Sequence, residues 1–173
     1  MRSPPLLPEE TLVRVLRLAK LDGITVLVLG GVFALMAAGN GQAPFAIVGL
    51  LAAGAGAIEL HGVGLLRRNL PAGMPWVFAS QPLLLLVIFG YCALRLTHFE
   101  MPPIPDSLRE AAAANAQALG MTLEDYFRVM NRVSAGLVAA IACAYQGWMA
   151  FYYWNRRRAV AQALDTVVFE TEE

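Results

Sequence analysis

Four long apolar segments, at residues 22–39, 44–66, 76–97 and 133–154, constrain the fold of this chain more than any other feature. At a rise of about 1.5 Å per residue, each segment can cross or nearly cross a hydrocarbon core about 30 Å thick as an α-helix. The composition agrees, because 58% of the 173 residues are hydrophobic and only 15% are charged. We therefore predict an all-α integral membrane protein, a four-transmembrane-helix bundle that forms a single membrane domain over residues 1–173.

The arginines and lysines predict which ends of the segments face the cytoplasm. Basic residues precede the first segment and follow the second and the fourth, whereas the connector between the first and second segments has none. By the positive-inside rule, both termini and the connector between the second and third segments are cytoplasmic. Trp76 and the aromatic run at residues 151–154 lie beside these basic residues, where interfacial aromatic residues belong. We expect a bacterial inner (plasma) membrane protein with its N and C termini inside.

The regions that flank the spans are also predicted to be helical. Apolar residues recur at helical spacing over residues 9–20. This amphipathic helix either lies along the inner headgroups or extends the first span, and the sequence leaves both open. Glu9 and Glu10 distinguish it from the short basic start of a signal peptide, so the first span is expected to remain uncleaved. The tail at residues 155–173 is expected to continue the last helix before it frays.

The connector at residues 101–131 is predicted to form an extracytoplasmic helical segment between the third and fourth spans. Ser107 and Glu110 have capping-box spacing, Gly120 supplies a helix stop, and Thr122 can cap the helix that runs into the fourth span.

The stretch LREAAAANAQALGMTLEDYF in this connector resembles the helix-turn-helix portion of ribbon-helix-helix DNA-binding proteins. It lacks the basic strand that would read a groove, and it lies between two membrane spans. The resemblance therefore implies two helices around Gly120 and no nucleic-acid partner. We expect an outward helical cap that packs on neighbouring copies.

Several polar side chains fall inside the apolar segments at a similar depth. Counted back from Arg67, Glu59 lies about 12 Å and His61 about 9 Å below the inner headgroup boundary. The predicted intramembrane polar layer consists of Glu59, His61, Ser80, Gln81, Thr25 and Gln146. Because insertion scales give a cost of about 2.5 to 3.5 kcal/mol for an Asp at the bilayer centre, a functional site is the default hypothesis.

The polar layer has two interpretations that the sequence does not separate. In the first, Glu59 is a titratable group in a homo-oligomeric channel or small transporter. In the second, a protonated Glu59 donates a hydrogen bond to Gln81 or to His61 of another copy, and the layer only holds helices together. A turn of about 200° separates Glu59 from His61 on a helix, so these two side chains address different neighbours.

The second segment is rich in small residues that allow another helix to approach closely. These helix-packing residues are Gly49, Ala53, Gly56, Ala57 and Gly64. We predict that the chain is a homo-oligomer in the lipid bilayer that self-associates through this segment and acts as an assembly or scaffold subunit. A partner membrane protein is the other kind of partner that the sequence allows.

The remaining residue types give no motif for catalysis, phosphate binding or a metal. Cys92 and Cys143 lie at different depths, and His61 and His98 lie on opposite sides of the membrane. We therefore predict no catalytic residue, no metal site and no cofactor, and expect that the protein is not an enzyme. A small four-span membrane enzyme stays a second alternative by analogy of fold alone.

Overall fold

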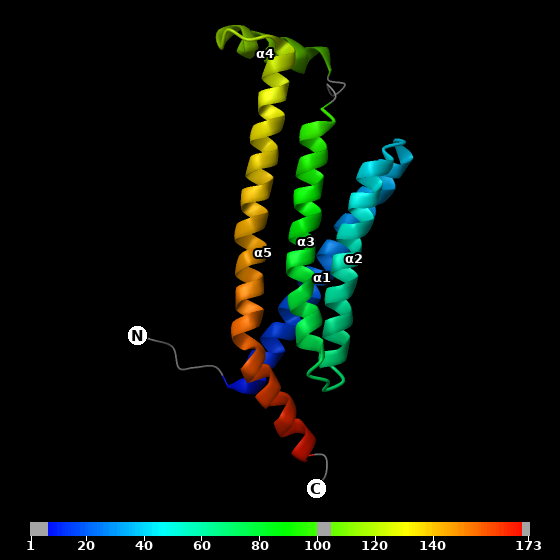
Figure 1. The fold of residues 1–173 in the computed structure, drawn as a ribbon, viewed down its shortest axis with the longest axis vertical. Coiled ribbons are helices and arrows are strands. Elements are labelled where there is room, and N and C mark those ends of the chain that lie inside the picture. Colours follow the sequence, from blue (N-terminus) through cyan, green and yellow to red (C-terminus); the bar gives the residue numbers. More distant parts are fainter. Residues whose placement is uncertain (1–6, 100–104, 171–173) are drawn as a thin grey trace, which may run out of the picture.

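The computed structural model describes residues 7–99 and 105–170, and every regular element in these ranges is an α-helix (Figure 1). The elements are α1 (Pro8–Gly39), α2 (Ala43–Leu66), α3 (Gly73–Thr97), α4 (Asp106–Ala118) and α5 (Leu123–Glu170). Of these, α1, α2, α3 and α5 are long and apolar enough to cross a membrane. The prediction of an all-helical chain with four such helices is confirmed.

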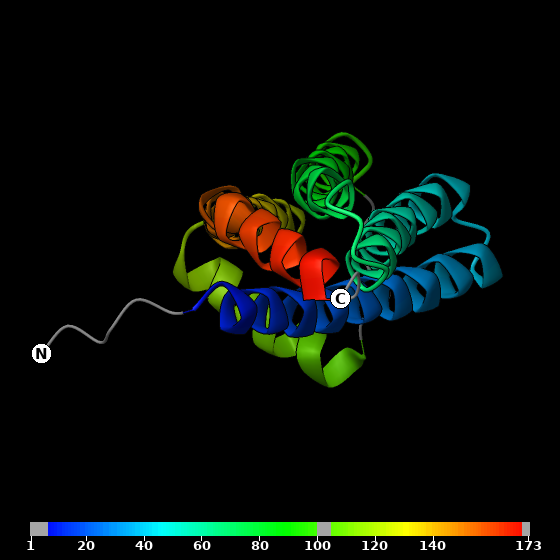
Figure 2. The same cartoon turned by 90° about the horizontal axis from the view of Figure 1, so that it is seen from below.

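The four long helices form a closed bundle. α1 packs on α2 and α5, and α3 packs on the same two helices from the opposite side (Figure 2). Short turns at residues 40–42 and 67–72 join the first three helices. Gly41 and Asn69 in these turns have φ angles of 70° and 58°, a left-handed conformation that Gly and Asn adopt more readily than other residues.

α1 is a single helix that includes both the predicted amphipathic segment and the predicted first span. Residues 9–20 continue into the span without a break. A helix lying along the headgroups would need a change of direction at this point, so the continuous α1 matches the other alternative, an extension of the span. α5 likewise continues from the fourth predicted span to Glu170.

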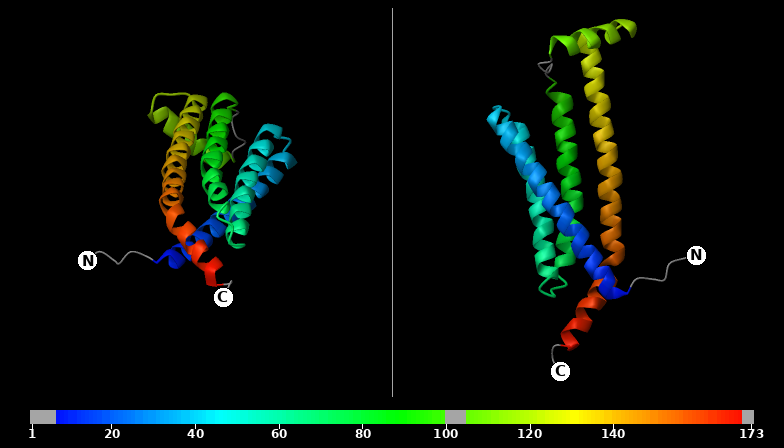
Figure 3. Two further views of the ribbon diagram at one scale, coloured as in Figure 1. Left: turned by 60° about the horizontal axis from the view of Figure 1, so that its bottom comes forward. Right: turned by 180° about the vertical axis from the view of Figure 1, so that it is seen from behind.

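The apolar core lies at the end of the bundle where α1 begins and α5 ends, which we call the arginine end because Arg67, Arg68 and the run at residues 156–158 lie there (Figure 1). The core residues are Val15, Ala19, Val63, Leu66, Met74, Val77, Met149, Tyr153, Val160 and Leu164. Towards the other end, the α1–α2 hairpin leans away from α5 (Figures 1 and 3). Most large apolar side chains there are exposed, as expected for a surface that contacts lipid.

α4 crosses the end of α5 as a separate helix, and its axis runs across the bundle rather than along it (Figures 1 and 3). Gly120 has a φ of 67° and follows the end of α4, which confirms the predicted stop. The hydroxyl of Thr122 accepts a hydrogen bond from the backbone N–H of Asp125 at 3.1 Å, which confirms the predicted cap.

The predicted capping box at Ser107 and Glu110 is wrong. α4 begins at Asp106 with Pro105 as its N-cap residue, so Ser107 lies within the helix and not at the N-cap position. Pro105 has the extended backbone conformation of an N-cap residue, with φ −57° and ψ 146°. The ring of proline fixes φ and sets this conformation without a side-chain oxygen, so the helix starts one residue before Ser107.

Candidate functional site: a buried polar cluster

Polar side chains from all four long helices meet close to the core; all of them are buried except Tyr145, which is 45% exposed. We call them the polar cluster; its members are Asp22 of α1, Glu59 of α2, Ser80 and Gln81 of α3, and Tyr145 and Tyr153 of α5. Because each helix contributes at least one member, the cluster exists only when the whole bundle is formed.

Gln81 is the centre of the polar cluster. Its amide nitrogen Nε2 lies 3.1 Å from Glu59 Oε1 and 3.4 Å from Asp22 Oδ2. The same nitrogen lies 3.3 Å from Ser80 Oγ, while the Ser80 hydroxyl donates to the backbone carbonyl of Val77 at 2.8 Å. Two carboxyl groups from different helices therefore share one amide donor that comes from a third helix.

The two tyrosines of α5 each donate to one of these acids. Tyr153 Oη donates to Glu59 Oε1 at 3.1 Å, and Tyr145 Oη donates to Asp22 Oδ1 at 2.9 Å. Each acid is thus an acceptor for one phenol and for the shared amide.

The acids are removed from solvent and from basic side chains. Glu59 is 2% exposed and Asp22 is 8% exposed. In the part of the chain whose side chains are described, the ion pair found joins Arg128 and Glu124 on the exposed start of α5. Neither Glu59 nor Asp22 therefore has a cationic partner there, although burying two like charges side by side is strongly unfavourable.

Glycines on both sides of Glu59 bring the neighbouring helices close enough for this arrangement. A Cβ added to Gly56 would lie 2.6 Å from the backbone nitrogen of Leu27 in α1. A Cβ added to Gly62 would lie 2.8 Å from the backbone oxygen of Gly73 in α3. Since real Cβ atoms do not approach other atoms so closely, only glycine permits these contacts. They set the distances at which Asp22 and Gln81 reach Glu59.

The predicted polar layer falls into two groups in the structure. Glu59, Ser80 and Gln81 belong to the polar cluster, and Gln146 is buried on the same helix as the two tyrosines. Thr25 and His61 are exposed on outward faces of α1 and α2. The centroids of the His61 and Trp76 rings lie 5.4 Å apart in a T-shaped arrangement, outside the cluster.

Sequence reasoning missed Asp22, Tyr145 and Tyr153. In the sequence, Asp22 is the first residue of the first apolar segment, and Tyr153 belongs to the aromatic run predicted to lie at the membrane interface. Helical spacing could have predicted the buried position of Asp22. Asp22 follows Val15 and Ala19 at intervals of four and three residues, on the same buried face of α1.

Two buried amide oxygens in this region have no donor. Gln81 Oε1 and Gln146 Oε1 lack a hydrogen-bond partner within the described part of the chain, and their side chains are 1% and 5% exposed. A buried acceptor without a donor costs about 1 to 3 kcal/mol, so such atoms are rare and call for an explanation. Both oxygens can accept a hydrogen bond from a water molecule or another donor.

The small residues of α2 mostly contact α1 of the same chain. A Cβ added to Gly49 would lie 2.6 Å from the backbone nitrogen of Ala34, and one added to Gly30 would lie 2.6 Å from that of Ala53. Gly56 faces α1 as well. Ala57 is exposed, and Gly64 has open space around it. The close packing predicted for α2 therefore occurs mainly against α1 of the same chain.

Comparisons of the chain with protein-family models, with curated proteins and with solved structures found no match. The four apolar helices indicate a membrane protein. Beyond this class, function has to be inferred from the chemistry of the polar cluster.

Proposed function

We propose that the protein is an integral membrane protein that holds a proton between Asp22 and Glu59, and that it is the proton-binding unit of a channel or small transporter. The observation that carries this proposal is the position of Gln81 Nε2, within 3.4 Å of one carboxyl group and 3.1 Å of the other. This shared donor makes Asp22 and Glu59 one site rather than two separate polar residues.

A proton is the ligand that the charges of the site favour. Two adjacent carboxylates without a cationic partner repel each other, and the repulsion is strong in a medium of low dielectric constant. One proton shared by the pair removes one of the two negative charges. The surrounding N–H and O–H groups already donate to the carboxyl oxygens, and a proton needs no additional cavity.

The position of the site supports exchange with the arginine end of the bundle. Along α2, Glu59 lies about 10 Å from Leu66 at the arginine end and about 24 Å from Ala43 at the other end. The unpartnered oxygen Gln81 Oε1, on the side chain that contacts both acids, is an acceptor that a hydrated proton can donate to. We propose that protons enter and leave the site from the arginine end.

The arginine end is proposed to face the cytoplasm of a bacterial cell. The start of α1, the turn at residues 67–72 and the last part of α5 all lie at this end (Figure 1). Eight of the described basic residues lie on this side, and four, Arg95, Arg109, Arg128 and Arg132, lie towards the other end. This excess supports the proposed orientation.

Proton flux into liposomes tests the proposal. We expect Glu59→Gln and Asp22→Asn each to lower the flux at least about tenfold, which corresponds to about 1.4 kcal/mol. Asp165→Asn is the matched control, because Asp165 is exposed near the end of α5 and outside the cluster. Unchanged flux in both acid variants of an active protein would overturn the proposal.

Infrared spectroscopy gives a second readout that does not depend on flux. The wild-type protein should show the carbonyl band of a protonated carboxyl group at neutral pH. This band should disappear or shift in Glu59→Gln and in Asp22→Asn, and stay unchanged in Asp165→Asn. Absence of the band from the wild type would contradict a proton held by the pair.

Self-association through α2 is a second candidate, and the open face of this helix favours it. A Cβ added to Gly54 or Gly64 would have nothing within 4 Å, and Ala57 between them is exposed. These three residues fall on one face at helical spacing. If copies meet there, Gly64→Leu should lower the number of subunits counted by native mass spectrometry in nanodiscs. A monomeric wild type would exclude this candidate.

A further inference from the structure

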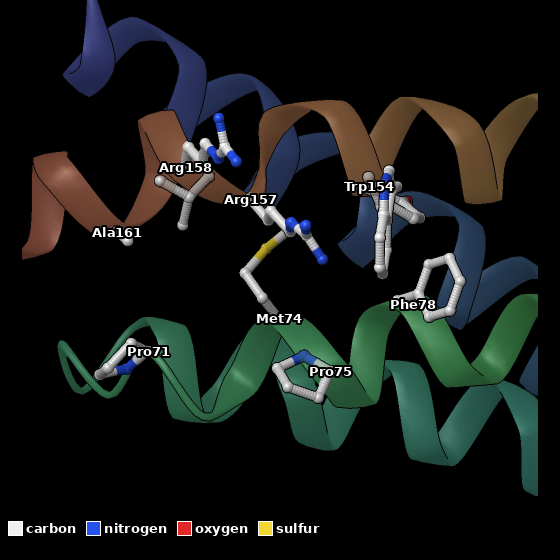
Figure 4. A pocket seen from close by; sticks show the side chains of 10 residues that line it. Pro71, Met74, Pro75, Phe78, Trp154, Arg157, Arg158 and Ala161 are labelled. Atoms are coloured by element: carbon white, nitrogen blue, oxygen red, sulfur yellow. The ribbon is translucent and has the colours of Figure 1, made fainter.

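A groove of about 440 Å³ lies between the start of α3 and the last third of α5, at the arginine end (Figure 4). Met74, Pro75 and Phe78 line it from α3, and Trp154 and Ala161 line it from α5. Its volume falls within the range of ligand pockets, about 300 to 1,000 Å³. The walls formed by these residues suit a hydrocarbon chain.

Two arginines lie at one side of this groove. Arg157 and Arg158 line it, and both are exposed. The Arg157 guanidinium carbon lies 3.5 Å from the centre of the Trp154 ring, so the cation stacks on the indole. No acidic residue lines the groove, and neither arginine forms an ion pair with the side chains that are described. The groove thus combines an apolar wall with an uncompensated positive charge of two.

We propose that this groove binds one anionic phospholipid. Its phosphate lies against Arg157 and Arg158, and one of its acyl chains lies along Met74 and Phe78. Guanidinium groups bind phosphate oxygens through paired N–H donors, and Arg157 is held in place by Trp154. The position matches this ligand, because the headgroup region of a membrane would lie at the ends of the spanning helices.

The apolar wall favours a phospholipid over a soluble anion. A free phosphate ion would contact the two arginines and leave the wall at Met74 and Phe78 uncovered. An acyl chain covers this wall and gains about 0.8 kcal/mol for each buried methylene group. Tyr153 forms part of the base of the same groove and donates to Glu59, so the bound lipid would lie next to the polar cluster. The lipid site is nevertheless independent of the proposal that the cluster holds a proton.

Native mass spectrometry of the full-length protein tests the site, with phosphatidylglycerol and phosphatidylcholine as the two probes. We expect the wild type to bind one phosphatidylglycerol at least about tenfold more tightly than phosphatidylcholine. Replacing both Arg157 and Arg158 with Gln should abolish this preference. The matched control replaces Arg14 and Arg68 with Gln, since both are exposed at the same end and neither lines this groove.

Equal loss of the preference in both double variants would indicate attraction to the general surface charge and would overturn the proposal. Ala161→Phe provides a second arm, because it fills the groove and leaves both arginines in place. It should lower phosphatidylglycerol binding, whereas unchanged binding would place the lipid elsewhere. Competition by inorganic phosphate at a similar affinity would mean that the site recognises the anion and not the lipid.

Discussion

At the scale of single residues, Gln81 has the most demanding position in the bundle. Its amide nitrogen serves two carboxyl groups, and its side chain is almost fully buried. An amide is neutral, so it can donate to both acids without adding a charge that would have to be desolvated. A lysine or arginine at this place would permanently offset one of the two negative charges, whereas Gln81 leaves that charge to be offset by a proton.

Replacing Gln81 with Leu should destabilise the bundle by about 2 kcal/mol, because hydrogen bonds to charged groups are lost while the acids stay buried. Gln146→Leu is the matched comparison: Gln146 is also buried and its amide oxygen likewise lacks a donor, but the hydrogen bonds to the two acids come from Gln81 and the tyrosines. That substitution should be neutral or stabilising. Thermal unfolding in detergent micelles measures both, and equal destabilisation by the two variants would show that Gln81 acts through packing alone.

At the scale of elements, the α1–α2 hairpin is the most closely packed part of the structure. Gly56 and Gly49 of α2 face Leu27 and Ala34 of α1, and Gly30 of α1 faces Ala53 of α2. The approach of two backbones increases van der Waals contact, which drives helix association where lipid replaces water. The hairpin therefore holds Asp22 and Glu59 on adjacent helices at a fixed separation.

A larger side chain should be tolerated on one face of α2 and not on the other. Gly56→Leu would force α1 and α2 apart, and overpacking of this kind costs about 1 to 3 kcal/mol. Gly54→Leu makes the same change two residues earlier, where nothing lies within 4 Å of an added Cβ. We expect a lower unfolding temperature only for Gly56→Leu. Equal effects would mean that the helices are not packed through Gly56.

At the scale of the whole molecule, the two ends of the bundle differ in character. The arginine end holds the core, the polar cluster and the groove. At the other end, α3 and α5 are joined by hydrogen bonds, one from Asn131 Nδ2 to the carbonyl oxygen of Arg95 at 2.9 Å. This division places the proposed chemistry near one membrane surface and leaves α4 at the opposite surface.

The proposed orientation predicts which end of the bundle reacts with a reagent that cannot cross the membrane. In a background without the native cysteines, Asn40→Cys should be labelled in intact cells, because the turn after α1 would lie outside. Arg68→Cys should be labelled only after the membrane is broken, because it lies at the arginine end. The reverse pattern would invert the orientation, and labelling of both in intact cells would refute a four-span arrangement.

Local features of the sequence are enough to predict the helices of this protein. Length and hydropathy are local properties, since an α-helix satisfies its hydrogen bonds within one segment, and they predicted the four long helices. Gly120 predicted the end of α4 because glycine readily adopts a positive φ, and Thr122 predicted the start of α5 because its hydroxyl can cap a helix. Glu59 and Gln81 were recognisable because polar side chains inside apolar segments are costly.

Which faces of these helices meet depends on the packing of the whole bundle. The apolar segments are hydrophobic on all sides, because lipid and protein interior favour similar side chains, and so their sequences do not distinguish the inward face. For this reason the pairing of Asp22 with Glu59, the inward position of Tyr153 and the outward position of Thr25 did not follow from the sequence. Each depends on contacts between residues far apart in the chain, and those contacts turn isolated polar residues into one site.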